Sequence, residues 1–223
     1  MRYDIIFLGG GPAGYEGAIH AGKKGLKTAV IEMYKPGGTC LQWGCIPTKT
    51  LLHTVKTIKM VKNAKKSGLN FGELSFDLDK INKQKDRVVS KLTKGIELLF
   101  KENGVDLIVG RGKVIAKDTV LVNGNDKIEG DRIVIAAGSL PADLPFLKPD
   151  GDRVINSNRA LELANIPEKL LVVGAGAIGV EMAVIYQYLG STVTVVELMD
   201  QIIPGSDAEV SDILKKELGK QKI

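Results

Sequence analysis

The pattern Gly-x-Gly-x-x-Gly occurs twice in this chain of 223 residues, at positions 9–14 and 174–179. Each copy follows an apolar run rich in Ile, Leu or Val and precedes a helix-like stretch. In both copies the third glycine lies 18 positions before an acidic residue, Glu32 or Glu197, that ends the next apolar run. This spacing is close to the roughly 20 residues typical of a dinucleotide-binding βαβ unit. The repeat therefore predicts an α/β chain with two Rossmann-like, three-layer domains.

The first copy has the residues that a bound pyrophosphate requires. Gly9 permits a tight turn, Gly11 lets the backbone approach the pyrophosphate, and Gly14 lets helix and strand pack closely. The helix that follows directs free N–H groups and its positive dipole end at the phosphates. Glu32 is placed to accept hydrogen bonds from a ribose. The alternative is a glycine-rich turn in an ordinary α/β domain, which the complete pattern disfavours.

The second copy predicts a second dinucleotide site by the same reasoning, through Gly174, Gly176, Gly179 and Glu197. A carboxylate at the end of the second strand repels a 2′-phosphate, so Glu197 favours NAD over NADP.

The residues between the two copies divide into helical and strand-like segments. Apolar periodicity and turn residues predict helices over 46–66 and 79–103, short strands within 105–122 and a buried strand over 132–139. The segment 140–152 contains three prolines and reads as a linker. We therefore expect a first domain over 1–145 and a second, incomplete domain over 146–223, with an open strand edge and an exposed apolar surface.

The only two cysteines are Cys40 and Cys45. Cytosolic disulfides are usually catalytic rather than structural, so the pair is interpreted as a reversible disulfide or as two reduced thiols. Pro47 suits the first turn of a helix and places Cys45 at that helix's N-terminus, where a thiolate is stabilised. Trp43 lies between the cysteines and either shields a disulfide or anchors the loop.

Helical spacing places Cys45, Lys49 and His53 on one face at i, i+4 and i+8. A cation one turn from a thiolate stabilises it and can also interact with a flavin. The alternative for Lys49 is a solvated surface lysine. His53 lies two turns from the thiol and is interpreted as packing or polar filler.

The run at 37–49, Gly-Gly-Thr-Cys-x-x-x-Gly-Cys-Ile-Pro-Thr-Lys, resembles the flavin- and pyridine-nucleotide-dependent disulfide oxidoreductases and, among them, the dihydrolipoamide dehydrogenases. The resemblance covers essentially the whole chain. It implies FAD on the first glycine motif, NAD on the second and a redox-active Cys40–Cys45 disulfide. The residues implied for FAD are Gly9, Gly11, Gly14, Glu32, Gly38, Thr39, Lys49, Gly112, Ala137, Gly138 and Ser139. Those implied for NAD are Gly174, Gly176, Gly179 and Glu197.

The resemblance also implies a mechanism with four catalytic residues. NADH and FAD exchange a hydride, Cys45 takes electrons from the flavin, and Cys40 exchanges with a substrate disulfide. Lys49 stands near the flavin edge and pairs with Glu181. The implied substrate is a lipoyl-bearing protein or a small disulfide, and the implied partners are a 2-oxo acid dehydrogenase complex or the glycine cleavage complex.

Several features depart from the family pattern. Gln42 and Trp43 replace the common Asn and branched aliphatic residue, and Ala137 replaces the usual Thr. The chain has only His20 and His53, neither in the context of the family's C-terminal acid–base histidine. The dimerisation domain of this homodimeric family is also missing. We therefore expect a truncated protein with little or no lipoamide turnover. The alternatives are a non-catalytic FAD-binding redox module and a sister reductase of the mercuric or glutathione type.

Charge and hydropathy narrow the class of partners. The formal net charge is +5, but the lysines are scattered, so nucleic-acid binding is disfavoured and anionic dinucleotides are favoured. No apolar run reaches the roughly 18 residues of a membrane span, and the N-terminus resembles no targeting segment. These patterns predict a cytoplasmic protein that needs neither membrane nor metal.

Overall fold

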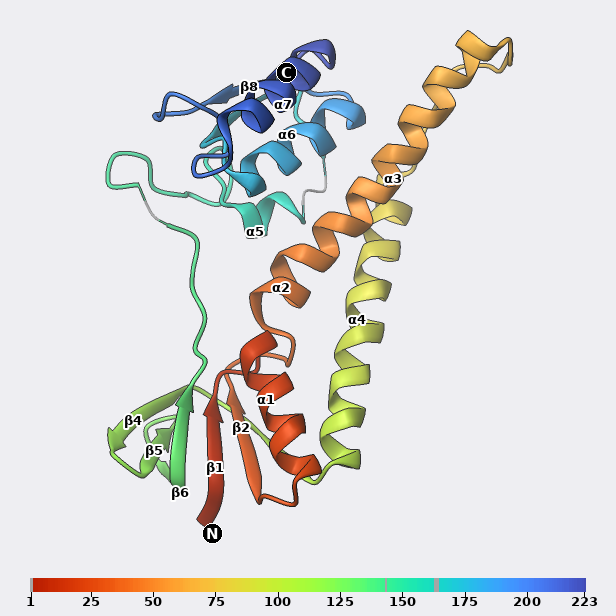
Figure 1. Ribbon diagram of the computed structural model, residues 1–223. Coiled ribbons are helices and arrows are strands. Elements are labelled where there is room, and N and C mark those ends of the chain that lie inside the picture. Colours follow the sequence, from red (N-terminus) through yellow and green to blue (C-terminus); the bar gives the residue numbers. More distant parts are fainter. Residues whose placement is uncertain (1, 143, 163–164) are drawn as a thin grey trace. The chain divides into compact units, whose positions relative to one another are not determined.

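The computed structural model describes residues 2–142, 144–162 and 165–223 (Figure 1). The chain divides into two compact units. The first consists of Met1–Ile46 and Asp86–Leu140, and the second of Pro47–Lys85 and Pro141–Ile223. Each unit is described by itself.

The first unit is built on a six-stranded sheet of order β3-β2-β1-β6-β5-β4. Its strands are β1 (Arg2–Leu8), β2 (Thr28–Glu32), β3 (Val105–Val109), β4 (Gly112–Ala116), β5 (Thr119–Val122) and β6 (Asp126–Ile135). Strands β3, β2, β1 and β6 are parallel, whereas β5 is antiparallel to both β6 and β4. The carboxyl ends of β1, β2 and β6 therefore meet at one edge of the sheet.

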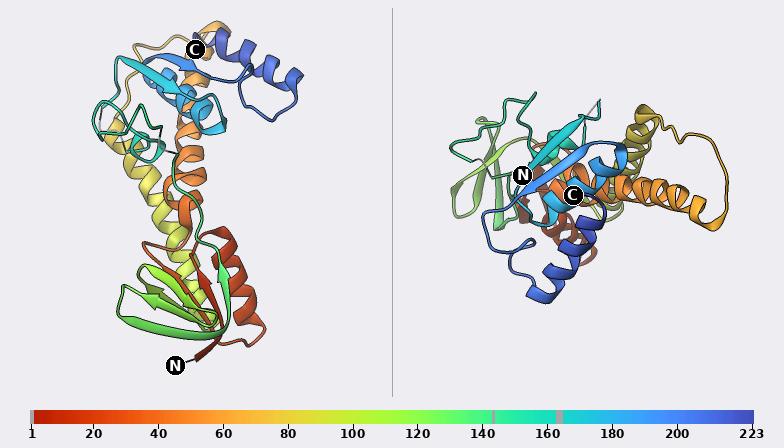
Figure 2. Two further views of the ribbon diagram at one scale, coloured as in Figure 1. Left: turned by 90° about the vertical axis from the view of Figure 1, so that its left-hand side faces the viewer. Right: turned by 90° about the horizontal axis from the view of Figure 1, so that it is seen from above.

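Helix α1 (Pro12–Lys23) connects β1 to β2 and packs on one face of the sheet (Figure 2). Its Ala18 and Ile19 share a buried cluster with Phe7 and Val30 of the strands. The same cluster contains Phe100 from the end of α4 (Leu78–Glu102). This apolar layer holds α1 against β1 and β2, so the loop between them is fixed at both ends.

The second unit contains a smaller βαβ arrangement. Parallel strands β7 (Lys169–Val173) and β8 (Thr192–Val196) are joined by α6 (Ala177–Leu189). The unit also contains α3 (Cys45–Ala64) from Pro47 onward, the 3₁₀ turn η1 (Lys65–Ser67), and the helices α5 (Ser157–Ala160) and α7 (Ala208–Lys220).

The fold class predicted from the two glycine motifs is confirmed, and so are the long helices. Helix α3 begins at Cys45, with Pro47 in its first turn. Three helices were not predicted: the short helix α2 (Gly38–Trp43), α5 and α7. The strand predicted over 132–139 corresponds to β6, which begins earlier, at Asp126, and ends at Ile135. Gly37, which precedes α2, has a φ of 111° and Gly38 one of 58°, so left-handed glycine conformations reverse the chain just before this turn of helix.

The predicted division near residue 145 lies close to the change of unit between Leu140 and Pro141. Residues 47–85, however, group with the second unit rather than with the first. The physical reason is that Leu51 and Val55 of α3 share a buried cluster with Met182 and Ala183 of α6. The assignment of FAD and NAD to domains 1–145 and 146–223 stays a prediction.

Within the described residues only β8 pairs with β7, so the other edge of β7 is open. One face of this two-stranded sheet is also exposed: Leu171 is 60% exposed, Val173 46% and Val196 43%. The open strand edge and the apolar surface expected from the sequence are both present. Among the described residues, none of the helices combines the length and the apolar character needed to cross a membrane.

Candidate functional site

The first glycine loop leaves no room for side chains at its two key positions. Gly9 has a φ of 109°, and a Cβ there would lie 2.2 Å from the carbonyl oxygen of Ala136. A Cβ on Gly14 would lie 1.8 Å from the carbonyl oxygen of Gly9. Only glycine allows the backbone of α1 to come this close to the end of β1, as the motif predicts.

The N-terminus of α1 is open to an anion. Gly11 is the N-cap, and no side chain of a described residue caps the helix. The chain does cap other helices: Asn156 and Asp207 accept hydrogen bonds from the first turns of α5 and α7. The first N–H groups of α1 have no intrahelical acceptor, so they are available to a phosphate.

Glu32 connects the end of β2 to the glycine loop. Its Oε2 accepts a hydrogen bond from the Gly10 amide at 2.7 Å, and its Oε1 accepts one from the Tyr34 amide at 2.9 Å. Each carboxylate oxygen retains a further lone pair, so this arrangement fixes the direction of the side chain and leaves it able to accept from a ribose. Binding of ribose by Glu32 stays a prediction.

The second unit reproduces this arrangement. The Ala175 amide donates to Glu197 Oε2 at 2.6 Å, and the Met199 amide donates to Oε1 at 3.0 Å. A Cβ on Gly179 would lie 2.0 Å from the carbonyl oxygen of Gly174. Helix α6 begins after Gly176, again without a side-chain cap among the described residues. Sequence repeat and hydrogen-bond repeat therefore coincide.

The pKa of the Glu197 carboxyl is lowered, first by the hydrogen bond from the Met199 amide and then by that from Ala175. The side chain is therefore ionised at neutral pH. A negative charge at the end of β8 opposes a 2′-phosphate, which is the electrostatic basis for expecting NAD in this unit.

The surroundings of the first glycine of the motif differ between the two units. A Cβ on Gly9 meets the backbone that follows β6, whereas a Cβ on Gly174 would have no atom within 4 Å among the described residues. The difference arises because β1 has a neighbouring strand on each side, whereas β7 pairs only with β8 in the described part of the chain.

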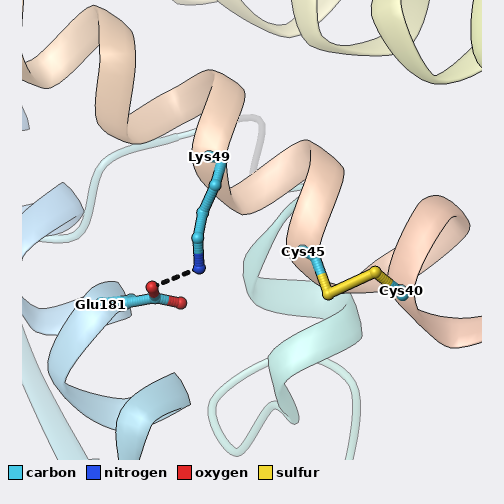
Figure 3. The surroundings of a disulfide bond; sticks show 4 residues. All are labelled: Cys40, Cys45, Lys49 and Glu181. Carbon is cyan, nitrogen blue, oxygen red and sulfur yellow. Dashed lines mark hydrogen bonds and ion pairs between the residues drawn. A yellow bond between two sulfur atoms is a disulfide. The ribbon is translucent and has the colours of Figure 1, made fainter.

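Cys40 and Cys45 form a disulfide, with their Cα atoms 4.7 Å apart (Figure 3). Cys40 lies in α2 and is half-buried, and Cys45 is the exposed first residue of α3. Helix α2 begins against the glycine loop, because the Gly37 amide donates to the Gly10 carbonyl at 2.8 Å. The redox pair predicted from the sequence is therefore attached to the predicted FAD loop.

The small-residue segment after β6 reaches the same edge of the sheet. The Ala136 amide donates to the Leu8 carbonyl at 2.8 Å, which extends the β1–β6 pairing by one residue. The Thr39 hydroxyl lies 3.5 Å from the Ser139 carbonyl oxygen. Most residues predicted to contact FAD thus gather at the carboxyl ends of β1, β2 and β6: Gly9, Gly11, Gly14, Glu32, Gly38, Thr39, Ala137, Gly138 and Ser139.

Gly112 has a packing role that the sequence did not reveal. A Cβ there would lie 2.4 Å from Leu8 Cδ1, with Ile31 and Val120 methyl groups at 3.1 Å. The glycine lets β4 lie close to the side chains of the parallel strands. Its contact with FAD, implied by the resemblance, stays a prediction.

Lys49 and Glu181 meet within the second unit. Lys49 Nζ, on α3, donates to Glu181 Oε1, on α6, at 2.5 Å (Figure 3). The Lys49 side chain is 60% exposed and that of Glu181 28%. The pairing implied by the resemblance is therefore present, whereas its role in catalysis stays a prediction.

Sequence reasoning missed two residues that support α2, because both act through tertiary contacts. Thr93 of α4 is bonded to Gln42, and Tyr34 meets the edge of Trp43, with ring centroids 5.3 Å apart and planes at 82°. The ring contact favours the anchoring interpretation of Trp43. His53 is exposed on α3, so it is not packed in the core.

Comparisons with known proteins agree with this geometry. Residues 3–223 match the family model described as pyridine nucleotide-disulphide oxidoreductase. A dihydrolipoyl dehydrogenase of Chlorobaculum tepidum is 42% identical, with coverage of 100% of this chain and 48% of the relative. A dihydrolipoamide dehydrogenase of Chaetomium thermophilum is 45% identical, with coverage of 99% and 45%.

Among solved structures, LpdA from Mycobacterium tuberculosis superposes with a TM-score of 0.89 at 28% identity, over 100% of this chain and 50% of that one. The HOCl-induced flavoprotein disulfide reductase RclA from Escherichia coli gives 0.83 at 29% identity, over 99% and 48%. The chain spans about half the length of the curated relatives that it matches. With a family match over nearly all of its residues, two glycine loops and a cysteine pair, this chain belongs to the pyridine nucleotide-disulphide oxidoreductases.

Proposed function

We propose that this chain carries the cofactor and disulfide machinery of a dihydrolipoyl dehydrogenase, which moves electrons between NAD, FAD and a dithiol substrate. The observation that carries the proposal is the attachment of the cysteine pair to the first glycine loop. A Cβ on Gly38 would lie 2.5 Å from the Cα of Gly11. The first turn of α2, which carries Cys40, therefore packs directly on the loop that would face the phosphates.

The first unit fits FAD. The first glycine loop has no side chains at Gly9, Gly11 and Gly14, where the pyrophosphate would approach, and the N-terminus of α1 presents uncapped N–H groups. Gly9, Gly11 and Gly38 would line the pyrophosphate, and Glu32 would accept from the ribose. When bound, the flavin and the nicotinamide supply the hydride and electron transfer, for which the protein provides position and electrostatics.

The disulfide has a distinct task for each sulfur. Cys45 begins α3, a 20-residue helix, so the N-terminal dipole and the free N–H groups stabilise its thiolate when the bond is reduced. Cys40 is the sulfur that exchanges with the substrate. One thiolate of dihydrolipoamide would attack Cys40 Sγ, break the Cys40–Cys45 bond and release Cys45 as a thiolate, which leaves a mixed disulfide between the substrate and Cys40. The second substrate thiolate would then attack the substrate sulfur of that mixed disulfide, so that the cyclic disulfide product leaves and Cys40 is released as a thiol.

Lys49 lies one turn after Cys45 on α3. Glu181 holds its ammonium group in one direction through the ion pair with α6. We assign Lys49 the role of a fixed positive charge near the reactive edge of the flavin, with Glu181 as its positioning partner.

The second unit is assigned to NAD, because Glu197 is ionised at the position that would face the ribose hydroxyls of a bound dinucleotide. The proposed substrate is dihydrolipoamide on a lipoyl-bearing protein. A 2-oxo acid dehydrogenase complex or the glycine cleavage complex is the proposed assembly, and the cytoplasm the proposed compartment.

The visible absorption spectrum of the purified chain tests this proposal. We expect a flavin spectrum that gains a long-wavelength band from a thiolate beside the flavin after addition of two electrons. The variant Cys45→Ser should keep the flavin and lose that band. A colourless protein, or a band that persists in Cys45→Ser, would contradict the proposal.

A further inference from the structure

Gln42 lies between the two cysteines and ties α2 to the body of the first unit. Its Nε2 group donates to the Pro36 carbonyl oxygen at 2.8 Å and to the Thr93 hydroxyl oxygen at 2.8 Å. Pro36 precedes α2. Thr93 belongs to α4 and lies 51 positions after Gln42 in the chain. One amide therefore bridges three segments of the backbone.

The directions of these hydrogen bonds are fixed by chemistry. A carbonyl oxygen can only accept, so the Gln42 amide must present its NH₂ group to Pro36. The Thr93 hydroxyl donates its hydrogen to the Val89 carbonyl at 3.0 Å, so it accepts from Gln42. Both hydrogens of the Gln42 amide are thus used. Thr93 is 5% exposed, so little water can replace a lost bond.

The bridge matters because α2 cannot hold its own shape. It contains six residues, far fewer than the roughly 12 that an isolated helix needs for stability in water. Helix α4, in contrast, has 25 residues and is packed through Ile96 and Phe100. An asparagine, the residue common at this position in the family, is one methylene shorter, so its amide would reach less far from the backbone of α2.

We propose that Gln42 is a positioning residue that holds Cys40 within bonding distance of Cys45 when the disulfide is reduced. The inference rests on the proposed function, since it applies to a disulfide that cycles. In the oxidised protein the S–S bond itself restrains residues 40–45. In the reduced protein the bridge from Gln42 to Thr93 supplies that restraint.

The direction of the effect follows from this difference. Loss of the bridge gives the dithiol more conformational freedom than it gives the disulfide, so the equilibrium moves toward the dithiol. With dithiothreitol as the partner, the Cys40–Cys45 bond breaks, an S–S bond forms within dithiothreitol, and two hydrogens pass to the protein sulfurs. No flavin or nicotinamide takes part in this exchange.

The experiment equilibrates the full 223-residue chain with mixtures of reduced and oxidised dithiothreitol, followed by alkylation of free thiols and mass spectrometry. Gln42→Met keeps the length of the side chain and removes both donors, and Thr93→Val keeps its shape and removes the hydroxyl. Each should shift the equilibrium toward the dithiol by about tenfold, which is about 30 mV toward a less negative potential for a two-electron couple. The double variant should shift no further than Gln42→Met, because that variant already removes the hydrogen bond to Thr93.

Two controls separate the bridge from general loosening. Thr93→Ser retains the hydroxyl and should stay near the wild-type equilibrium. Gln84→Met makes the same replacement at an exposed glutamine of α4 and should also stay near it. Equal dithiol–disulfide equilibria for wild type, Gln42→Met and Thr93→Val would overturn this inference and leave the proposed function standing. A wild-type disulfide that resists reduction throughout the series would contradict the proposed function as well. Should Gln42→Met fail to fold, Thr93→Val against Thr93→Ser decides the question.

Discussion

Gly38 packs directly on the backbone of Gly11, with no room for a side chain at position 38: a Cβ on Gly38 would lie 2.5 Å from the Cα of Gly11. Gly38 also has a φ of 58°, which costs an L-residue about 1–2 kcal/mol. Gly38→Ala should therefore destabilise the first unit by at least that amount and weaken retention of FAD. Chemical denaturation and the flavin-to-protein absorbance ratio after gel filtration measure the two effects.

Gly72→Ala is the matched control, because a Cβ there meets no atom within 4 Å among the described residues and Gly72 has no positive φ. Its stability should differ little from wild type. A Gly38→Ala protein with unchanged stability and a full complement of flavin would contradict this prediction. It would show that the close contact between Gly38 and Gly11 is not needed for stability or for retention of FAD.

Replacement of another glycine, Gly95, should increase the stability of the protein. Gly95 lies in the middle of α4, is exposed, and has open space around a Cβ position. Gly95→Ala reduces the freedom of the unfolded chain and is expected to stabilise the protein by about 0.5–1 kcal/mol. Thermal unfolding should show a higher midpoint, whereas Gly25→Ala, at a φ of 79°, should lower it. Equal midpoints for the two variants would contradict this reasoning.

Removal of the Lys49 charge should affect turnover more than stability. The side chain is 60% exposed, so the ion pair with Glu181 contributes about 0–1 kcal/mol to folding. If Lys49 has the role proposed above, Lys49→Met should slow the reduction of an artificial acceptor by NADH by about tenfold or more, because a fixed positive charge is lost. Glu181→Gln should give a smaller loss in the same assay.

Lys56→Met, on an exposed part of the same helix, serves as the control and should retain full turnover. If Lys49→Met and Lys56→Met behave alike, Lys49 is a surface lysine, as the alternative interpretation holds.

Glu197 should give the second unit a pH-dependent stability. Its pKa in the folded protein is lowered by hydrogen bonds from the Met199 and Ala175 amides, so its contribution is present above the ordinary value of 4.5 and is lost as the pH falls through the folded pKa. Glu197→Gln should be less stable than wild type at pH 7, and the difference should shrink well below pH 4.5. Denaturation curves at both pH values test this. A difference that is the same at both would assign the effect to something other than ionisation.

Tyr3 should have the opposite dependence at alkaline pH. Burial, and then donation to Asp106 Oδ2 at 2.9 Å, raise its pKa to about 12 from an ordinary 10.0. The stability that it contributes is full below about pH 10 and is lost as the pH rises toward 12. Tyr3→Phe should cost about 1–2 kcal/mol at pH 7 and should flatten this alkaline decline. Absorbance titration of the phenolate gives an independent check.

The sequence was most informative where local rules suffice. The two glycine motifs, each followed by a carboxylate, identified both βαβ units, and Pro47 marked the start of α3 at Cys45. Helix α2 was missed because its six residues, which begin with Gly38, carry no periodic pattern. The Gln42–Thr93 bridge joins positions 51 residues apart, and no local pattern encodes such a contact.

The contacts between residues 47–85 and the second unit were not predictable for a related reason. Apolar periodicity in α3 shows that one face is buried, but it does not identify the neighbouring element. The cluster of Leu51 and Val55 with Met182 supplies that information only in the folded chain.

The spacing between loop and carboxylate has a consequence for how such a chain can vary. In both units the amide that binds the carboxylate lies 22 positions before it, at Gly10 for Glu32 and at Ala175 for Glu197. One residue inserted into the intervening helix would turn everything after it by about 100°, and the carboxylate would no longer meet its amide. Substitutions at the exposed positions of α1 and α6 leave this spacing unchanged, whereas an insertion or deletion between the two fixed points breaks the hydrogen bond from amide to carboxylate.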